Sequence, residues 1–317
     1  MTISRKSSRL SLKFLVLTYF IASTLCQKVI LFGSSGVVGS EVLKALTKQT
    51  FFKEAILVGR NFEKVQSILE KADFNDSNSS ATFKIMQVSD LNRLDENEDI
   101  IGLRADACII TVGVAHPYRL NLKYWHSIEV DMVASIARFC NKSEVKYMSL
   151  LSSVSAEKEP TPFSLSELEE SDNNPLGVWG VMKHYDRLKA LEENEVIDSA
   201  RKESTISLFQ ASTIVTREYR YGFFDRAFFI LHKFLNPILP SMWHSVDVRL
   251  LGMSMAGDAI QKLSPQIPSN ASCSVLKNDD GGLLKIFRLT YNDYLSIAGV
   301  DFENEKNQDQ NAKRKKL

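Results

Sequence analysis

The stretch that decides the fold is Val29-Ile-Leu-Phe-Gly33-Ser-Ser-Gly36-Val-Val-Gly39. Its first residues form a short apolar run with β-branched side chains, which predicts a buried parallel strand over residues 28–32. Its glycines have the spacing G-x-x-G-x-x-G, and residues 41–46 continue with the apolar spacing of a helix. A glycine turn between a strand and an amphipathic helix is the context expected for a bound pyrophosphate.

Each glycine has a separate task in such a turn. Gly33 makes the tight exit from the strand, Gly36 lets a pyrophosphate approach the backbone, and Gly39 lets the helix pack close to the sheet. Backbone N–H groups and the positive helix N-terminus then hold the phosphates. The alternative is a turn that only connects strand and helix. The candidate cofactor-binding residues of the turn are Gly33, Ser34, Ser35, Gly36, Val37, Val38 and Gly39.

Strands and helices alternate along the rest of the chain. Further strands are predicted at 55–59, 83–88, 105–112, 147–152 and 205–209, and further helices at 61–72, 125–141 and 178–194. This alternation is typical of an α/β protein with a doubly wound parallel sheet, the Rossmann fold. Prolines and acidic residues at 157–175 predict an exposed loop. We expect a single domain over residues 28–302 with a small C-terminal helical elaboration.

Three residues after the predicted strands are further candidates for cofactor binding. Arg60 follows the second strand, where an Asp or Glu would bind the ribose hydroxyls of NAD; an Arg instead pairs with the 2′-phosphate of NADP. Arg60 therefore favours NADP over NAD, and its alternative role is that of a solvated strand-end residue. Asp90 either accepts a hydrogen bond from the adenine or caps the next helix. Gly113 follows the fourth strand.

The composition excludes several classes of function. The net charge is +1, and hydrophobic and charged residues make up 44% and 24% of the chain, so nothing points to a nucleic-acid partner. The His residues are widely separated, and no zinc-ligand spacing with Cys is present, which predicts no metal site. The scattered cysteines predict no disulfide framework, and Cys108 is expected to be a buried core residue.

The first 27 residues predict a targeting segment. Four basic residues up to Lys13 precede an apolar run of 13 residues at 14–26, shorter than the roughly 20 needed to span a bilayer. This layout favours a cleaved secretory signal peptide, and with it the secretory pathway or endoplasmic reticulum. The alternatives are a mitochondrial targeting segment, an uncleaved anchor that gives membrane association, or a surface helix. Residues 303–317 are polar and end in basic residues, which predicts a disordered tail.

These motifs occur along the chain in an order that resembles the short-chain dehydrogenase/reductase superfamily. More narrowly, it resembles the atypical Tat-interacting-protein-type oxidoreductases over residues 28–259. The resemblance rests on the glycine turn, Gly59-Arg60, Gly113, Leu150-Leu-Ser-Ser153, the helix that carries Lys183, and Leu239-Pro-Ser-Met-Trp-His-Ser-Val246. It implies an NAD(P)-binding oxidoreductase.

The resemblance also implies a catalytic set of Ser and Tyr-x-x-x-Lys. The Ser aligns with Ser152 or Ser153, and the Lys aligns with Lys183, which the resemblance implies would also bind the cofactor by holding the nicotinamide ribose. The Tyr position then holds Trp179, whose indole cannot act as a proton acid. Tyr185 lies two residues past Lys183, so on a helix it is expected to point away from that Lys and not to substitute.

The leading hypothesis is therefore an NADP(H)-binding protein with altered or absent reductase activity. One alternative is an active NADPH-dependent reductase of a small carbonyl compound. Another is a non-catalytic NADPH-sensing protein that acts through a protein partner or a homodimer.

Overall fold

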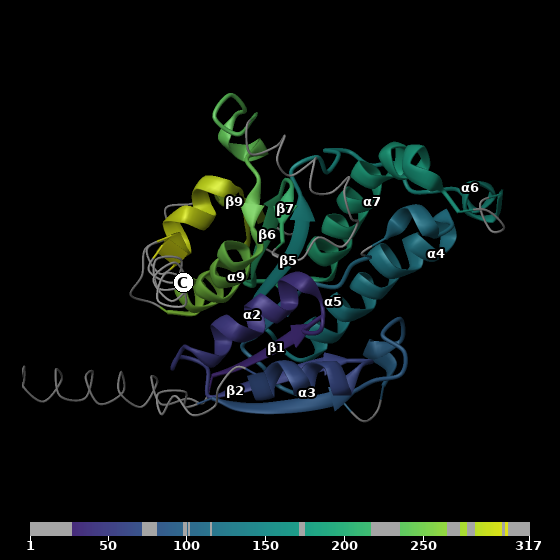
Figure 1. The fold of residues 1–317 in the computed structure, drawn as a ribbon. Coiled ribbons are helices and arrows are strands. Elements are labelled where there is room, and N and C mark those ends of the chain that lie inside the picture. The colour runs from purple at the N-terminus through teal and green to yellow at the C-terminus, as the bar shows by residue number, and fades with distance from the viewer. Residues whose placement is uncertain are drawn as a thin grey trace, which may run out of the picture.

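The computed structural model of the chain describes residues 27–71, 81–97, 100, 102–114, 116–170, 175–216, 235–264, 273–277, 283–299 and 302–303. Within these ranges, eight strands form one sheet in the order β3-β2-β1-β4-β5-β6-β10-β9 (Figure 1). The strands are β1 Lys28–Phe32, β2 Glu54–Gly59, β3 Thr82–Gln87, β4 Ala107–Ile110, β5 Tyr147–Ser153, β6 Thr205–Ala211, β9 Cys273–Lys277 and β10 Leu283–Leu289.

The sheet is parallel from β3 to β10, and the β10–β9 pair is antiparallel. The strand order reverses between β1 and β4, and such a switch point is where ligands bind at the carboxyl ends of the strands. Two short strands, β7 (Ile214–Val215) and β8 (Val246–Asp247), pair separately. All residues of β4 are fully buried, as expected of a strand covered on both faces.

Helices cover both faces of the sheet (Figure 1). The α-helices are α2 Val37–Thr47, α3 Phe62–Lys71, α4 Leu122–His126, α5 Met132–Lys142, α6 Leu165–Glu170, α7 Gly177–Ser199 and α9 Val248–Leu263. Shorter turns are η1 Leu94–Glu96, η2 Pro117–Arg119, η4 Ser241–Trp243 and the π-helical η3 Ser127–Asp131, and residues 291–299 are also helical. One core joins the sheet to α2, α3 and α9, and a second joins its other face to α5 and α7.

The predicted doubly wound α/β sheet is confirmed. The strand at 28–32 matches β1 at both ends, and the other predicted strands match to within two residues at each end. The helix predicted at 125–141 corresponds to the continuous run of α4, η3 and α5. The C-terminal part is more than a helical elaboration, because β10 and β9 extend the sheet and α9 packs against α2 in the core.

Cys108 of β4 and Cys140 of α5 are disulfide-bonded, with their Cα atoms 6.5 Å apart. The expectation of no disulfide framework is therefore corrected for this pair. The two cysteines are 32 residues apart in the sequence, and only the packing of α5 on β4 brings them together. The predicted burial of Cys108 in the core is confirmed.

The predicted leader and tail lie outside the described residues, apart from Gln27 and Glu303. Within the described ranges, no helix is both long and apolar enough to cross a membrane. The same ranges hold no group of three or more His, Cys, Asp or Glu side chains that could bind a metal ion.

Candidate functional site

The glycine turn packs tightly at the carboxyl end of β1. Gly33 has a φ of +81°, and a Cβ there would lie 2.8 Å from the backbone of Thr111. A Cβ at Gly39 would collide with the carbonyl group of Gly33 and lie 2.6 Å from the Thr111 hydroxyl. That hydroxyl donates to the carbonyl oxygen of Phe32 at 2.8 Å. Side chains are therefore excluded from two positions of the turn by the turn itself and by β4.

The N-terminus of α2 is suited to bind a phosphate group. Gly36 is its N-cap and provides no side-chain hydrogen bond, and the first turn contains no acidic residue. The Gly36 N–H donates to the Gly33 carbonyl oxygen at 2.8 Å, which holds the turn closed. The first N–H groups of an 11-residue helix thus meet no capping side chain and no carboxylate, so the turn fits a dinucleotide pyrophosphate.

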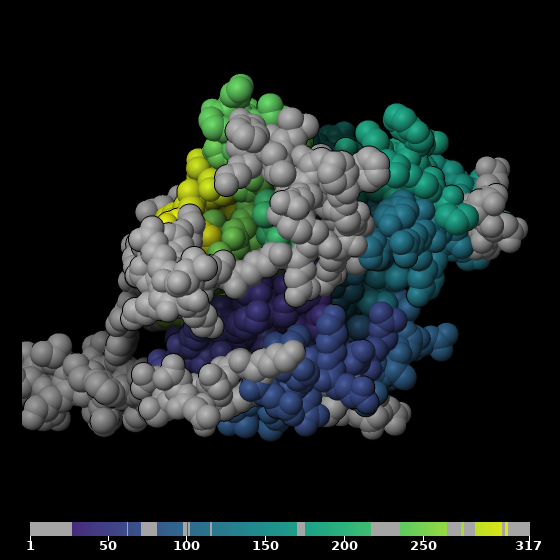
Figure 2. Space-filling view, viewed as in Figure 1, coloured from purple at the N-terminus to yellow at the C-terminus, as the bar shows by residue number. Residues whose placement is uncertain are grey.

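The turn occupies the middle of the molecule. In the space-filling view the purple β1–α2 segment lies between the blue α3 region and the green C-terminal residues (Figure 2). Arg60 follows β2 directly and is exposed, and its carbonyl oxygen accepts from the Gln87 side chain at 3.4 Å. Exposed Arg60 is therefore at the same edge of the sheet as the turn.

Asp90 and Gly113 lie beyond β3 and β4. The Asp90 carboxylate accepts from the backbone N–H of Asn92 at 2.9 Å, which is a local turn rather than the cap of a helix. Gly113 is exposed, and a Cβ on it would lie 3.4 Å from the Glu129 carboxylate. Gly113 therefore follows a strand of the switch point, whereas Asp90 follows the edge strand β3.

The two candidate catalytic serines end β5 and have different partners. Ser152 donates to Glu193 of α7 at 2.6 Å, and Gln210 of β6 donates to the same carboxylate oxygen at 3.0 Å. Ser153 lies 2.9 Å from the hydroxyl of Ser155. Ser152 is therefore engaged in joining α7 to the sheet, whereas Ser153 pairs with a neighbouring turn residue.

Trp179 and Lys183 do not lie in the interior with these serines. The Trp179 side chain is 83% exposed, and Lys183 is also exposed, one turn later on α7. Tyr185 and Lys189 lie on the opposite side of the helix. Tyr185 is about 200° around the helix axis from Lys183. Tyr185-Asp-Arg-Leu-Lys189 has the Tyr-x-x-x-Lys spacing, which was the available sequence signal for this pair.

Tyr185 lies against Ser153 and an aromatic partner. The Ser153 side chain is close enough to lower the pKa of the Tyr185 phenol, and the Tyr185 ring packs against a buried cluster that includes Leu122, Trp125 and Leu188. Burial raises the pKa of the Tyr185 phenol, and the nearby Lys189 ammonium opposes that rise. The phenol therefore holds its proton at neutral pH and is placed to donate it.

Lys189 is buried between two carboxylates. Its ammonium donates to Glu129 of η3 at 2.6 Å and to Glu192 at 2.7 Å. Burial alone would lower the pKa of Lys189, but the attraction of Glu129 and Glu192 outweighs it and holds the pKa well above its usual value. Glu129 also accepts the backbone N–H of Val114 at 2.9 Å. No spacing in the sequence links Glu129 to Lys189, so only the fold shows this contact.

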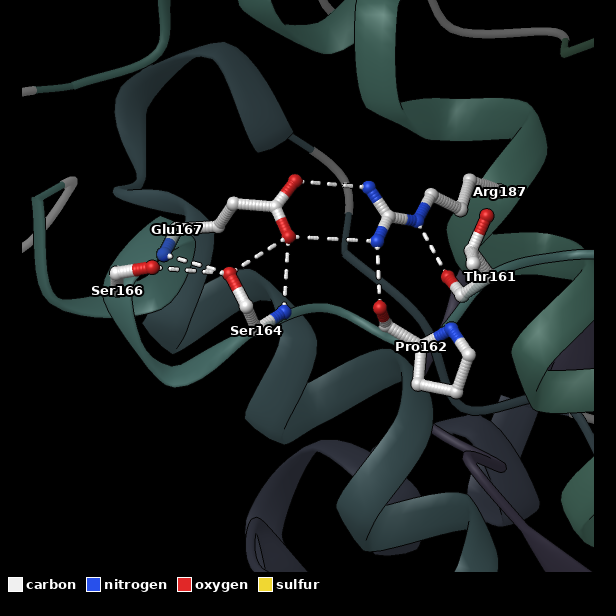
Figure 3. A network of polar contacts seen from close by, with 6 residues as sticks. All are labelled: Thr161, Pro162, Ser164, Ser166, Glu167 and Arg187. Carbon is white, nitrogen blue, oxygen red and sulfur yellow. Dashed lines mark hydrogen bonds and ion pairs between the residues drawn. The ribbon is translucent and has the colours of Figure 1, made fainter.

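Arg187 lies on α7 between Tyr185 and Lys189 and binds the segment at 161–167 (Figure 3). Its guanidinium donates to the carbonyl oxygens of Thr161 and Pro162 at 2.6 and 2.7 Å, and to Glu167 at 3.0 Å. Its charged carbon lies 3.7 Å from the centre of the Phe163 ring. The segment at 161–167 is therefore held against the helix that carries the Tyr-x-x-x-Lys pair. The expectation of a loop throughout 157–175 is corrected, because residues Leu165–Glu170 form α6.

Solved structures resemble this fold at low sequence identity. The yeast methylglyoxal/isovaleraldehyde reductase Gre2 complexed with NADPH is 14% identical, over 83% of this chain and 78% of that one, with a TM-score of 0.52. A thiolation-reductase di-domain from an archaeal non-ribosomal peptide synthetase is 15% identical, over 73% and 67%, with a TM-score of 0.50. A search of curated protein sequences finds no match.

A family model matches more than half of the sequence. The matched residues are 29–213, which run from β1 through the glycine turn and α7 to the residues just after β6. The match therefore includes the switch point, both serines and the Tyr-x-x-x-Lys pair. With the Rossmann sheet and the phosphate-binding turn, it shows that the chain belongs to the NAD dependent epimerase/dehydratase family, whose members are NAD(P)-binding proteins of the short-chain dehydrogenase/reductase type.

Proposed function

We propose that this protein is an NADPH-dependent reductase of a small carbonyl compound, with Ser153, Tyr185 and Lys189 as its catalytic group. The observation that carries the proposal is the placement of Tyr185 against Ser153, with the buried Lys189 one turn further along α7. The main ground for the hypothesis of altered or absent activity was Trp179 in the Tyr position, and a second was Gln210-Ala-Ser212 in place of the family's Arg-Pro-Gly. A complete Tyr-x-x-x-Lys pair beside a Ser at the end of β5 removes the main ground for it.

Each residue of the group has a distinct role in this proposal. Tyr185 donates its proton to the substrate oxygen, because burial keeps the phenol protonated. Ser153 donates a hydrogen bond to the same oxygen and orients it. The Lys189 ammonium favours the phenolate that remains and holds the nicotinamide ribose. Bound NADPH would supply the hydride.

The cofactor preference is proposed from Arg60. Its exposed guanidinium follows β2 at the carboxyl edge of the sheet, where it would pair with a 2′-phosphate. Residues 33–39 would hold the pyrophosphate at the N-terminus of α2. NADP is therefore the proposed cofactor, and NAD the weaker ligand.

We retain the secretory leader as a proposal about the compartment. The disulfide between Cys108 and Cys140 supports it, because disulfides persist in oxidising compartments and are rare in the cytosol. N-terminal sequencing of the mature protein tests it, with cleavage before Lys28 as the expected result. An intact N-terminus, with the Cys108 and Cys140 peptides unlinked in a non-reducing map, would contradict it.

The proposed reductase is tested in two steps. Purified protein is titrated with NADPH and with NADH by fluorescence, and the loaded protein is then assayed for NADPH oxidation across a panel of small aldehydes and ketones. Binding at micromolar NADPH with turnover of at least one carbonyl supports the proposal. Binding without turnover on any carbonyl would favour the NADPH-sensing alternative instead.

A further inference from the structure

A buried cluster of three ionisable groups lies behind Tyr185. Glu129, Lys189 and Glu192 are 3%, 7% and 0% exposed, and the Lys189 ammonium bonds both carboxyls. One cation facing two ionised carboxylates would leave a net negative charge in the interior. Such an uncompensated buried charge is strongly unfavourable, so one of the two carboxyls is expected to hold a proton.

The hydrogen bonds distinguish the two carboxyls. Glu129 accepts from Lys189 with one oxygen and from the backbone N–H of Val114 with the other. Glu192 accepts from Lys189 with Oε2, while its Oε1 is buried and has no hydrogen-bond partner among the described residues. An ionised carboxylate is stabilised by donors to both oxygens, and only Glu129 has them.

The surroundings of Glu192 also favour its protonated form. The titratable groups that face it are Tyr185, Lys189 and Glu193 of its own helix and Glu129 of η3. Burial is the main cause that raises the pKa of Glu192, the Lys189 ammonium opposes it, and Glu129 and Glu193 raise it further. The rise that burial causes exceeds the attraction of a cation already shared with Glu129.

We infer that Glu192 is a positioning residue that carries a proton at neutral pH and so keeps the Glu129–Lys189–Glu192 cluster electrically neutral behind Tyr185. Two of the three N–H groups of Lys189 go to the carboxyls, which leaves the third for the nicotinamide ribose. Loss of the Glu192 proton would make the cluster negative and disfavour the Tyr185 phenolate. The role in catalysis rests on the proposed function, but the protonation of Glu192 does not.

The test compares Glu192→Gln with wild type, because glutamine has the shape of a protonated glutamate but does not ionise. A folded-state pKa above the unfolded value of 4.5 gives wild type a stability that is full below pH 4.5 and is lost as the pH rises through the folded pKa. Glutamine suffers no such loss. The ratio of the folding constants, variant over wild type, should therefore rise with pH by up to about tenfold per pH unit in that window.

Denaturant unfolding from about pH 5 to pH 8 measures this ratio. Asp198→Asn removes a carboxylate charge from an exposed position of the same helix, and we expect no comparable rise for it. A ratio for Glu192→Gln that is flat with pH would overturn the inference, because a lost hydrogen bond shifts stability equally at all pH values. Absent NADPH binding together with a rising ratio would refute the proposed function and leave the protonation of Glu192 standing.

A second measurement needs no variant, in case Glu192→Gln does not fold. Side-chain carboxyl resonances of wild type with carbon-13-labelled glutamate are followed by NMR against pH. One glutamate should keep the chemical shift of a protonated carboxyl at neutral pH. If every glutamate carboxyl has ionised by neutral pH, the inference is wrong.

Discussion

The ring of Tyr185 stacks on the indole of Trp125, with the ring centroids 6.2 Å apart and the planes inclined by 29°. Trp125 is 1% exposed, so α4 provides a fixed surface for one side of the proposed proton donor. The indole N–H has no hydrogen-bond partner among the described residues. Replacement of Trp125 therefore leaves no acceptor without its donor. The contact is therefore one of packing.

Replacement of Trp125 should consequently depend on size and not on polarity. Trp125→Ala is expected to destabilise the protein by about 3–5 kcal/mol, as large-to-small core changes do. Trp125→Phe keeps an aromatic ring against Tyr185 and should lose much less. Denaturant unfolding measures both. Equal losses of unfolding free energy for the two variants would show that an aromatic ring stacked on Tyr185 does not contribute to stability.

Replacement of Tyr185 tests the assignment of the proton donor. Tyr185→Phe removes the hydroxyl and keeps the ring, so reductase turnover should fall by about 10²- to 10⁴-fold with NADPH affinity retained. Trp179→Phe is the matched control, because Trp179 is 83% exposed on the same helix. The alignment that places Trp179 in the site expects the reverse order of effects. Steady-state kinetics measure the turnover of both variants, and a fluorescence titration measures their NADPH affinity.

The sequence predicts the sheet and the glycine turn well, because both depend on short-range patterns. Continuous apolar runs identify strands that are buried on both faces, and the glycine spacing follows from contacts within a few residues. Thr111, which packs against Gly33 and Gly39, shows the limit: it directly follows β4, and nothing in the turn itself indicates it.

The orientation of α7 could not be predicted, because its first turns expose apolar side chains and its later turns bury charged side chains beside Leu188 and Val196. Val178, Trp179 and Met182 are 64%, 83% and 65% exposed, while Lys189 and Glu192 are buried. Apolar periodicity normally marks the buried side of a helix, but in the first turns of α7 the apolar residues are on the exposed side. Buried Lys189 has one carboxyl partner on its own helix, Glu192, and the other, Glu129, is 60 residues away in the sequence.

Replacement of Gly36 should separate cofactor binding from stability. A Cβ there would lie 3.1 Å from the Gly33 carbonyl oxygen, so Gly36→Ala requires that carbonyl to shift by a few tenths of an ångström, and we expect the variant to fold with a small loss of stability. The added methyl group stands where a pyrophosphate approaches the backbone, and NADPH affinity should fall at least about tenfold. Gly299→Ala, whose Cβ would lie at an ordinary 3.7 Å from Leu295, is the control. Unchanged NADPH affinity in Gly36→Ala would argue against phosphate binding at this turn.

Replacement of Arg60 should change the choice between NADP and NAD. Arg60→Asp removes the cation and adds a carboxylate that accepts from ribose hydroxyls, and a hydrogen bond to a charged group contributes about 1.5–3 kcal/mol. The ratio of NADPH to NADH affinity should therefore fall by at least about tenfold. Stability should not change, because Arg60 is exposed. An unaltered affinity ratio in paired titrations would remove Arg60 from the cofactor site.

Replacement of Glu167 should loosen the segment at 161–170, which includes α6, in a pH-dependent way. The Arg187 guanidinium, aided by the backbone N–H and hydroxyl of Ser164, lowers the pKa of Glu167 from 4.5 to about 2 (Figure 3). A depressed folded-state pKa stabilises the protein above the unfolded value of 4.5, and that contribution is lost as the pH falls through about 2. Glu167→Gln should therefore differ from wild type above pH 4.5 and converge with it near pH 2.

The effect should be local, because the ion pair joins the short helix α6 and the residues before it to α7. Hydrogen exchange of the amides of this segment, measured from neutral pH down to about pH 2 and corrected for the intrinsic rate, is the suitable readout. Loss of protection above pH 4.5 in Glu167→Gln, with Glu169→Gln on the same short helix α6 behaving as wild type, is the expected result. A constant difference between Glu167→Gln and wild type at every pH would mean that the segment is held by the carbonyl contacts of Arg187 and not by its ion pair.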